Sequence, residues 1–115
     1  MATSTIKDEQ KEVITITTNT LDHLASVSCT LTRCGKTGIL YIGAYNTNSA
    51  LAVGGTATFK FANLPELQVA STGVGYSGST AMVASVSTTA ATLRVTGAQW
   101  VAGYSCSIYI PVLLK

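Results

Sequence analysis

Charge is the first thing that this sequence lacks. Only 10% of its 115 residues are charged, against about 25% in an ordinary globular domain. Six of the twelve charged residues lie within residues 1–22, so the rest of the chain takes its polarity from Ser, Thr, Asn and Gly. The net charge of +2 is too small to drive electrostatic binding of nucleic acid, and we expect no nucleic-acid partner.

Long hydrophobic runs are also absent. No apolar stretch approaches the roughly 20 residues that cross a bilayer, and residues 1–12 contain no apolar signal-peptide core. We therefore expect no membrane insertion. The hydrophobic content is nevertheless 47%, which together with the low charge favours a folded chain, and the length suits one domain rather than two.

Catalytic side chains are scarce as well. Three of the five acidic residues lie within residues 1–12, and His23 is the only histidine. Residues 73–78 match Gly-x-Gly-x-x-Gly by letter, but no helix is expected to follow, so the dinucleotide-binding interpretation fails. We expect no enzyme, no cofactor and no metal site, and we expect His23 to be a plain surface residue.

The cysteine count is odd. Cys29 and Cys106 lie at the apolar positions of two alternating segments, whereas Cys34 precedes a glycine turn. We expect three reduced thiols, of which Cys29 and Cys106 are buried and Cys34 is accessible. A cross-strand bridge between Cys29 and Cys106 is the alternative.

Period-two alternation of apolar and polar residues begins after residue 12 and predicts β-strands. About eight strands follow at the spacing of an all-β sandwich or barrel. Residues 39–42 do not alternate and predict a strand buried on both faces. Breaks are expected at residues 19–23 and in the Gly- and Ser-rich residues 71–79. Residues 1–12 form a separate tail, with a short stalk helix at residues 3–12 if any helix exists.

Aromatic and amide side chains gather near the predicted loops. Trp100 lies between Gly97 and Gly103, which favours a protruding loop over a strand. An aromatic ring can bind the apolar face of a sugar while amides bond its hydroxyls. The predicted saccharide-binding residues are Trp100, Gln99, Tyr45, Asn46 and Tyr76. The alternative is that Trp100 packs in the core or in a subunit interface.

One order of features resembles a known family. A strand at residues 38–42 precedes a Thr-rich strand at residues 56–61, and Ala-Asn-Leu-Pro follows at residues 62–65. Further strands follow at residues 81–86 and 91–95 (ATLRV). Residues 25–115 thereby resemble the C-terminal receptor-binding heads of tail-fibre and baseplate proteins from bacteriophages of Gram-positive bacteria.

The resemblance implies an antiparallel, jelly-roll-like β-sandwich head at residues 13–115 that assembles as a homotrimer. It implies binding of host cell-wall glycan, attachment to other virion tail proteins through the N-terminus, and an extracellular role at the virion tail tip. The low charge also fits an oligomer whose interface covers apolar surface. The alternatives are a structural virion or baseplate subunit without a ligand and a bacterial carbohydrate-binding module.

Overall fold

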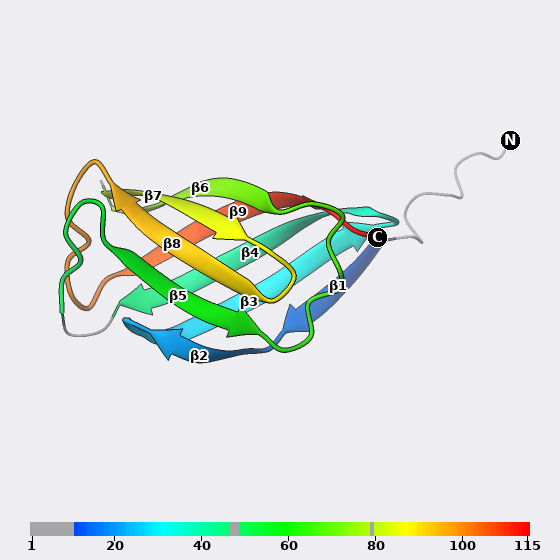
Figure 1. Ribbon diagram of the computed structural model, residues 1–115, viewed down its shortest axis with the longest axis horizontal. Helices are drawn as coiled ribbons and strands as arrows, with labels where there is room; N and C mark the ends of the chain where they lie inside the picture. Colours follow the sequence, from blue (N-terminus) through cyan, green and yellow to red (C-terminus); the bar gives the residue numbers. More distant parts are fainter. Residues whose placement is uncertain (1–10, 47–48, 79) are drawn as a thin grey trace, which may run out of the picture.

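Nine strands, each antiparallel to its neighbours, form the part of the chain that the computed structural model describes, residues 11–46, 49–78 and 80–115 (Figure 1). These residues contain no helix. The strands are β1 (Lys11–Ile16), β2 (Thr18–Asp22), β3 (Leu24–Cys34), β4 (Thr37–Asn46), β5 (Thr56–Phe61), β6 (Ser71–Ser77), β7 (Thr80–Val86), β8 (Ala90–Thr96) and β9 (Ser105–Leu113). The all-β, antiparallel prediction is confirmed.

The sheet is rolled up on itself. Its strand order is β1-β3-β4-β9-β6-β7-β8-β5-β2, so the two edge strands are β1 and β2. Only Thr17 separates these two strands in the chain, and the two edges therefore meet where the chain passes from one to the other. The result is a sheet nearly closed into a barrel, which removes most of the exposed strand edge.

Asn63 fixes the point at which the chain changes edges. Its side-chain oxygen accepts the N–H of Thr17 at 2.7 Å, and its side-chain nitrogen donates to the carbonyl of Thr15 at 3.1 Å. The carbonyl of Thr17 accepts the N–H of Ala62 at 2.8 Å. These bonds satisfy a carbonyl on β1 and the backbone groups of Thr17, at the point where the chain passes from its pairing with β3 to its pairing with β5.

Alternation of side chains separates a single core from the outer surface. On β9 the inward residues Cys106, Ile108, Ile110 and Val112 are buried, and their neighbours in the chain are exposed. The same alternation in the other long strands fills the interior with aliphatic residues, Met82, Phe59 and Phe61. A continuous core of this kind is what stabilises a nearly closed sheet.

Residues 71–79 correct one expectation. Residues 71–77 form β6 rather than a loop, because Gly73 and Gly75 face inward against β9. A Cβ atom on Gly73 would lie 2.5 Å from Cγ1 of Ile110, and one on Gly75 would meet Ile108 in the same way. The glycines therefore mark a close approach of two strands. Because glycine is also common in turns, the residue type alone does not distinguish a turn from a close strand pair.

The structure differs from three other expectations, two about element boundaries and one about burial. Residues 18–22 pair with β5 as β2, although the sequence predicts a break there. Residues 39–42 are not buried on both faces, because Ile39 is exposed and Tyr41 is half-buried. Lys11 and Glu12 belong to β1, where they pair with Cys34 and Arg33, so a helix does not reach residue 12. The rest of the predicted stalk segment, residues 1–10, lies outside the described residues.

The cysteines lie where the alternation places them. Cys29 and Cys106 are buried, Cys34 is exposed, and all three are free thiols. The predicted burial is confirmed, and the bridge between Cys29 and Cys106 is not formed.

Candidate functional site

Trp100 does not protrude. Its side chain is 0% exposed, and the neighbouring Asn46 is also 0% exposed. The expectation of an exposed ring on a loop is therefore wrong, and so is the expectation of a surface amide at Asn46. The two flanking glycines, Gly97 and Gly103, have positive φ angles of 83° and 80° and turn the chain so that the ring points back into the core.

The role of Trp100 is to hold one end of the molecule together. Its backbone exchanges hydrogen bonds with Leu51 at 2.9 and 3.0 Å, and its indole Nε1 donates to the carbonyl of Tyr104 at 3.1 Å. The amide of Asn46 donates to the carbonyls of Trp100 and Val101 at 3.3 and 3.2 Å. Trp100 and Asn46 are thus positioning residues, because they fix three segments against one another.

Tyr45 and Tyr76 are exposed, as a ligand-binding role requires. Both point outward from the sheet, with 44% and 59% of the residue exposed. Tyr45 on β4 pairs with Ser105, and Tyr76 on β6 pairs with Ser107, so the serine hydroxyls of β9 lie between the two rings. Neighbouring strands lie about 4.8 Å apart, which places the two strands that bear these tyrosines about 10 Å apart.

Two further tyrosines, which are not among the predicted site residues, extend this surface. Tyr41 on β4 and Tyr109 on β9 are directly paired, and their ring centroids are 5.0 Å apart. The Tyr41 hydroxyl lies 3.3 Å from Oγ of Ser107. A Cβ on Gly43 would lie 2.8 Å from the Tyr41 oxygen, so the ring lies over this glycine. We call the outward side chains of Tyr41, Tyr45, Tyr76 and Tyr109 the tyrosine face.

Gln99 lies beside the hairpin that follows Tyr76. It is exposed, and its carbonyl accepts the hydroxyl of Thr80 at 2.8 Å, next to the pairing of Thr80 with Ser77. Tyr104 is also exposed, at the start of β9. Of the predicted site, Tyr45, Tyr76 and Gln99 therefore remain available to a ligand. The alternation of Tyr109 with Ile108 and Ile110 is the sequence signal for the outward position of Tyr109.

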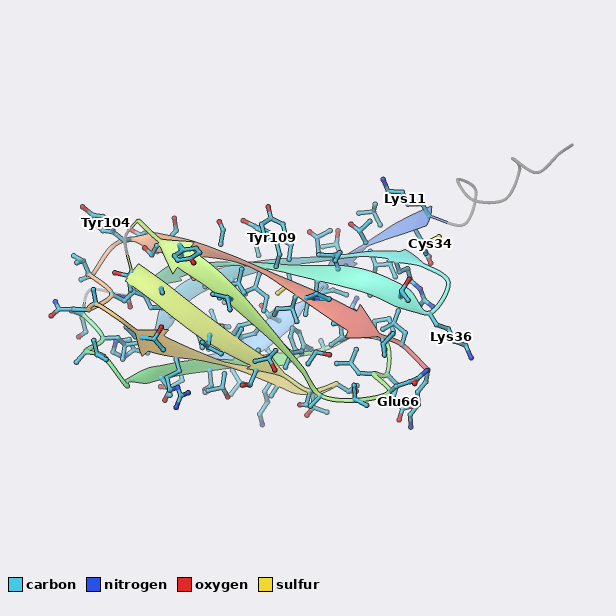
Figure 2. All side chains as sticks on the ribbon, turned by 90° about the horizontal axis from the view of Figure 1, so that it is seen from above. Lys11, Cys34, Lys36, Glu66, Tyr104 and Tyr109 are labelled. Atoms are coloured by element: carbon cyan, nitrogen blue, oxygen red, sulfur yellow. The ribbon has the colours of Figure 1, made fainter. Side chains whose placement is uncertain are left out.

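The tyrosine face carries no charge. None of β4, β6, β7 and β9 contains Asp, Glu, Lys, Arg or His. The described chain begins at Lys11 and ends at Lys115, which lie at one end of the molecule, and we call the opposite end the distal end (Figure 1). Figure 2 shows Tyr104 at the distal end, Lys11, Cys34 and Lys36 at the other, and Tyr109 between them.

Titratable groups offer little chemistry in the described part of the chain. No group of three or more His, Cys, Asp or Glu residues there is placed to hold a metal ion. Burial raises the pKa of the Cys29 thiol to about 12 and that of Cys106 to about 11, which leaves both thiols protonated and unreactive at neutral pH. No helix among the described residues is long and apolar enough to cross a membrane.

Comparisons of the chain with protein-family models, with curated proteins and with solved structures give no match.

Proposed function

We propose that this chain is the receptor-binding head of a bacteriophage tail-fibre or baseplate protein, and that its tyrosine face binds host cell-surface saccharide. The observation that carries the proposal is an outward surface of tyrosine rings, serine hydroxyls and no charged side chain. Rings of this kind contact the apolar face of a pyranose, and the hydroxyls bond its polar edge. The resemblance found in the sequence supplies the viral part of the proposal.

The position of the chain ends fits this role. Lys11 and Lys115 lie at the same end of the molecule, opposite the end that bears Tyr104 (Figures 1 and 2). A head attached to other virion proteins through its N-terminus would therefore direct its distal end away from the virion. We further propose that the head acts outside the cell as a homotrimer, as the family resemblance implies.

The saccharide site is tested by truncating the exposed rings. Tyr76→Ala and Tyr45→Ala are compared with the parent on an array of bacterial surface glycans and on host cells. Removing an aromatic anchor commonly costs about 2 kcal/mol, so we expect affinity to fall roughly thirtyfold. Arg94→Ala, at an exposed position on β8, is the matched control and is expected to bind as the parent does.

Two outcomes contradict the saccharide site. The first is that the parent binds no glycan and no cell, which favours a structural virion subunit without a ligand. The second is that both tyrosine variants remain folded and bind as tightly as Arg94→Ala. Salt provides an independent check, because an uncharged contact surface predicts an affinity that changes little with ionic strength.

A further inference from the structure

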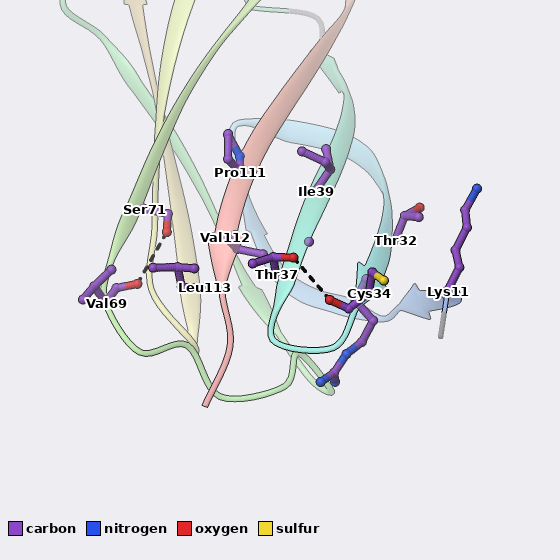
Figure 3. A pocket seen from close by; sticks show the side chains of 12 residues that line it. Lys11, Thr32, Cys34, Thr37, Ile39, Val69, Ser71, Pro111, Val112 and Leu113 are labelled. Atoms are coloured by element: carbon purple, nitrogen blue, oxygen red, sulfur yellow. Dashed lines mark hydrogen bonds between the residues drawn. The ribbon is translucent and has the colours of Figure 1, made fainter. Parts of the chain in front are cut away.

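A second feature of the outer surface lies beside the chain ends. An open groove of about 570 Å³ crosses the outward side of β1, β3, β4, β9 and the start of β6 (Figure 3). Ile39, Pro111 and Leu113 lie in its middle, Val69 and Ser71 on one side, and Cys34 and Lys11 on the other. The groove is separate from Tyr45 and Tyr76, which lie toward the distal ends of β4 and β6.

The middle of the groove is apolar and its charge lies at the rim. Lys11 is on β1, which is two strands away from β4 and Ile39. The guanidinium of Arg33 is engaged elsewhere, since its Nε and Nη2 both donate to the carbonyl of Gly35, at 3.0 and 2.8 Å. Among the residues that the structure describes, no acidic side chain lines the groove. A partner that covers Ile39 and Leu113 therefore buries no charge at the centre.

Exposed apolar residues are distributed unevenly over the described surface. The large exposed apolar side chains lie on β1, β4, β6, β9 and loops, and none lies on β2, β5, β7 or β8. Around the groove, Val13, Ile39, Val69 and Leu113 are each 44–63% exposed, and Pro111 is also exposed. Together they present on the order of 400 Å² of apolar surface, close to the apolar share that one partner contributes to a standard protein interface.

We propose that copies of this chain contact one another through this groove, around a symmetry axis that passes over Ile39 and Leu113. Around such an axis the same residues of each copy meet, so any charge at the centre would face a like charge. The uncharged centre of the groove avoids this repulsion. Lys11 lies two strands, or about 10 Å, from the strand that carries Ile39, so the Lys11 side chains of different copies stay away from the axis, where salt screens their repulsion.

A polar small ligand is a poorer occupant than a second copy. Among the described residues, no buried side-chain nitrogen or oxygen lacks a hydrogen-bond partner, so the groove holds no buried polar group that awaits a ligand. The exposed lining of the groove also spans several strands, and a contact surface of that width suits a protein partner better than a small ligand. The inference rests on the oligomeric part of the proposed function and is independent of saccharide binding.

Oligomeric mass in solution is the first measurement. We expect the parent to exceed the 11.9 kDa of one chain at micromolar concentration. Leu113→Asp places a carboxylate at the centre of the interface and is expected to weaken association at least thirtyfold. The variant is expected to stay folded, with the same far-UV circular dichroism spectrum as the parent. Ile39→Asp tests the same position from β4 if the Leu113 variant does not fold. Val53→Asp, at an exposed apolar position outside the groove, is the control and is expected to associate normally.

Cys34 supplies the second measurement, because it lines the groove and is exposed whereas Cys29 and Cys106 are buried. A bismaleimide is expected to link two copies through Cys34 in the parent and in Val53→Asp, and not in Leu113→Asp. A parent that stays monomeric overturns both the groove and the oligomeric proposal, whatever its glycan binding. An oligomer that Leu113→Asp and Ile39→Asp leave intact, with no link through Cys34, overturns the groove alone.

Discussion

The structural role of Trp100 follows from the complete burial of its ring. The ring is fully buried, and its indole nitrogen donates to the Tyr104 carbonyl next to the hydrogen bond from the Asn46 backbone to the same carbonyl. A buried ring of this size contributes mainly by removing apolar surface from water and by filling volume that no other side chain occupies. The residue that the sequence favours as a ligand contact is therefore a core residue that binds the backbone of Tyr104.

Trp100→Ala is predicted to destabilise the fold rather than to remove a ligand contact. Loss of a buried aromatic side chain costs about 3–5 kcal/mol, and the Tyr104 carbonyl loses one of its two donors. Trp100→Phe keeps much of the volume and is expected to cost less than Trp100→Ala. Urea unfolding followed by circular dichroism gives both values. Equal stability of Trp100→Ala and the parent would contradict the burial of the ring.

The buried thiols predict a dependence of stability on alkaline pH. Burial raises the pKa of Cys29 from 9.0 to about 12 and that of Cys106 from 9.0 to about 11. A raised pKa in the folded state means that the stabilisation is complete below pH 9 and is lost as the pH rises toward 11–12. Over that window each thiol lowers the free energy of unfolding by about 1.4 kcal/mol per pH unit.

Replacement of one thiol isolates this effect from every other titration. Between pH 9 and 11, the free energy of unfolding of Cys106→Ala is expected to fall less steeply with pH than that of the parent. The difference in slope is at most the contribution of one thiol. Cys34→Ala is the control, because Cys34 is exposed, and its slope is expected to equal that of the parent. Urea midpoints measured across this pH range check the prediction, and identical slopes for all three proteins contradict it.

At the scale of the elements, β6 depends on two residues that have no side chain. Gly73 and Gly75 let β6 approach β9 so closely that any added carbon would overlap Ile110 and Ile108. β6 joins β4 and β9 on one side of the molecule to β7 and β8 on the other. The position of Tyr76 on the tyrosine face follows from this close pairing.

Gly75→Ala is predicted to cost at least about 2 kcal/mol of stability, at the upper range of overpacking, because both a side chain and a backbone carbonyl of β9 would have to move. The matched control is the next residue in the chain: Val74→Ala alters an outward, exposed side chain and is expected to change stability by less than about 0.5 kcal/mol. Thermal or urea unfolding compares the two. Equal effects of the two substitutions would show that β6 and β9 are not closely packed.

The strands predicted from the sequence are those whose burial follows from local alternation. β9 and the middle of β3 alternate strictly, so their inward cysteines could be assigned from sequence alone. The positions of β6 and Trp100 could not be assigned from sequence, because both depend on tertiary neighbours. The glycines in β6 and around Trp100 are favoured equally by a turn and by a close approach of two segments. The sequence predicts Tyr45 and Tyr76 in loops, but both lie in strands that project them outward.

At the scale of the whole molecule, one core connects the distal end to the end that carries the chain termini. Trp100 belongs to the same buried cluster as Val112 and Leu114, which lie near the C-terminus. The strand change held by Asn63 joins the two edges of the rolled sheet. Neither end of the molecule has a core of its own, so loss of packing at one end exposes side chains that stabilise the other.

This continuity predicts that the chain unfolds in one cooperative transition. Trp100 is the only tryptophan, so its fluorescence reports on the distal end, whereas far-UV circular dichroism reports on all nine strands. We expect the two signals to give the same urea midpoint and the same slope. If copies associate, both midpoints rise with protein concentration, but they rise together. A fluorescence transition that precedes the circular dichroism transition would mean that the segments around Trp100 open on their own, and the distal end would then be an independent unit rather than part of the single core of the rolled sheet.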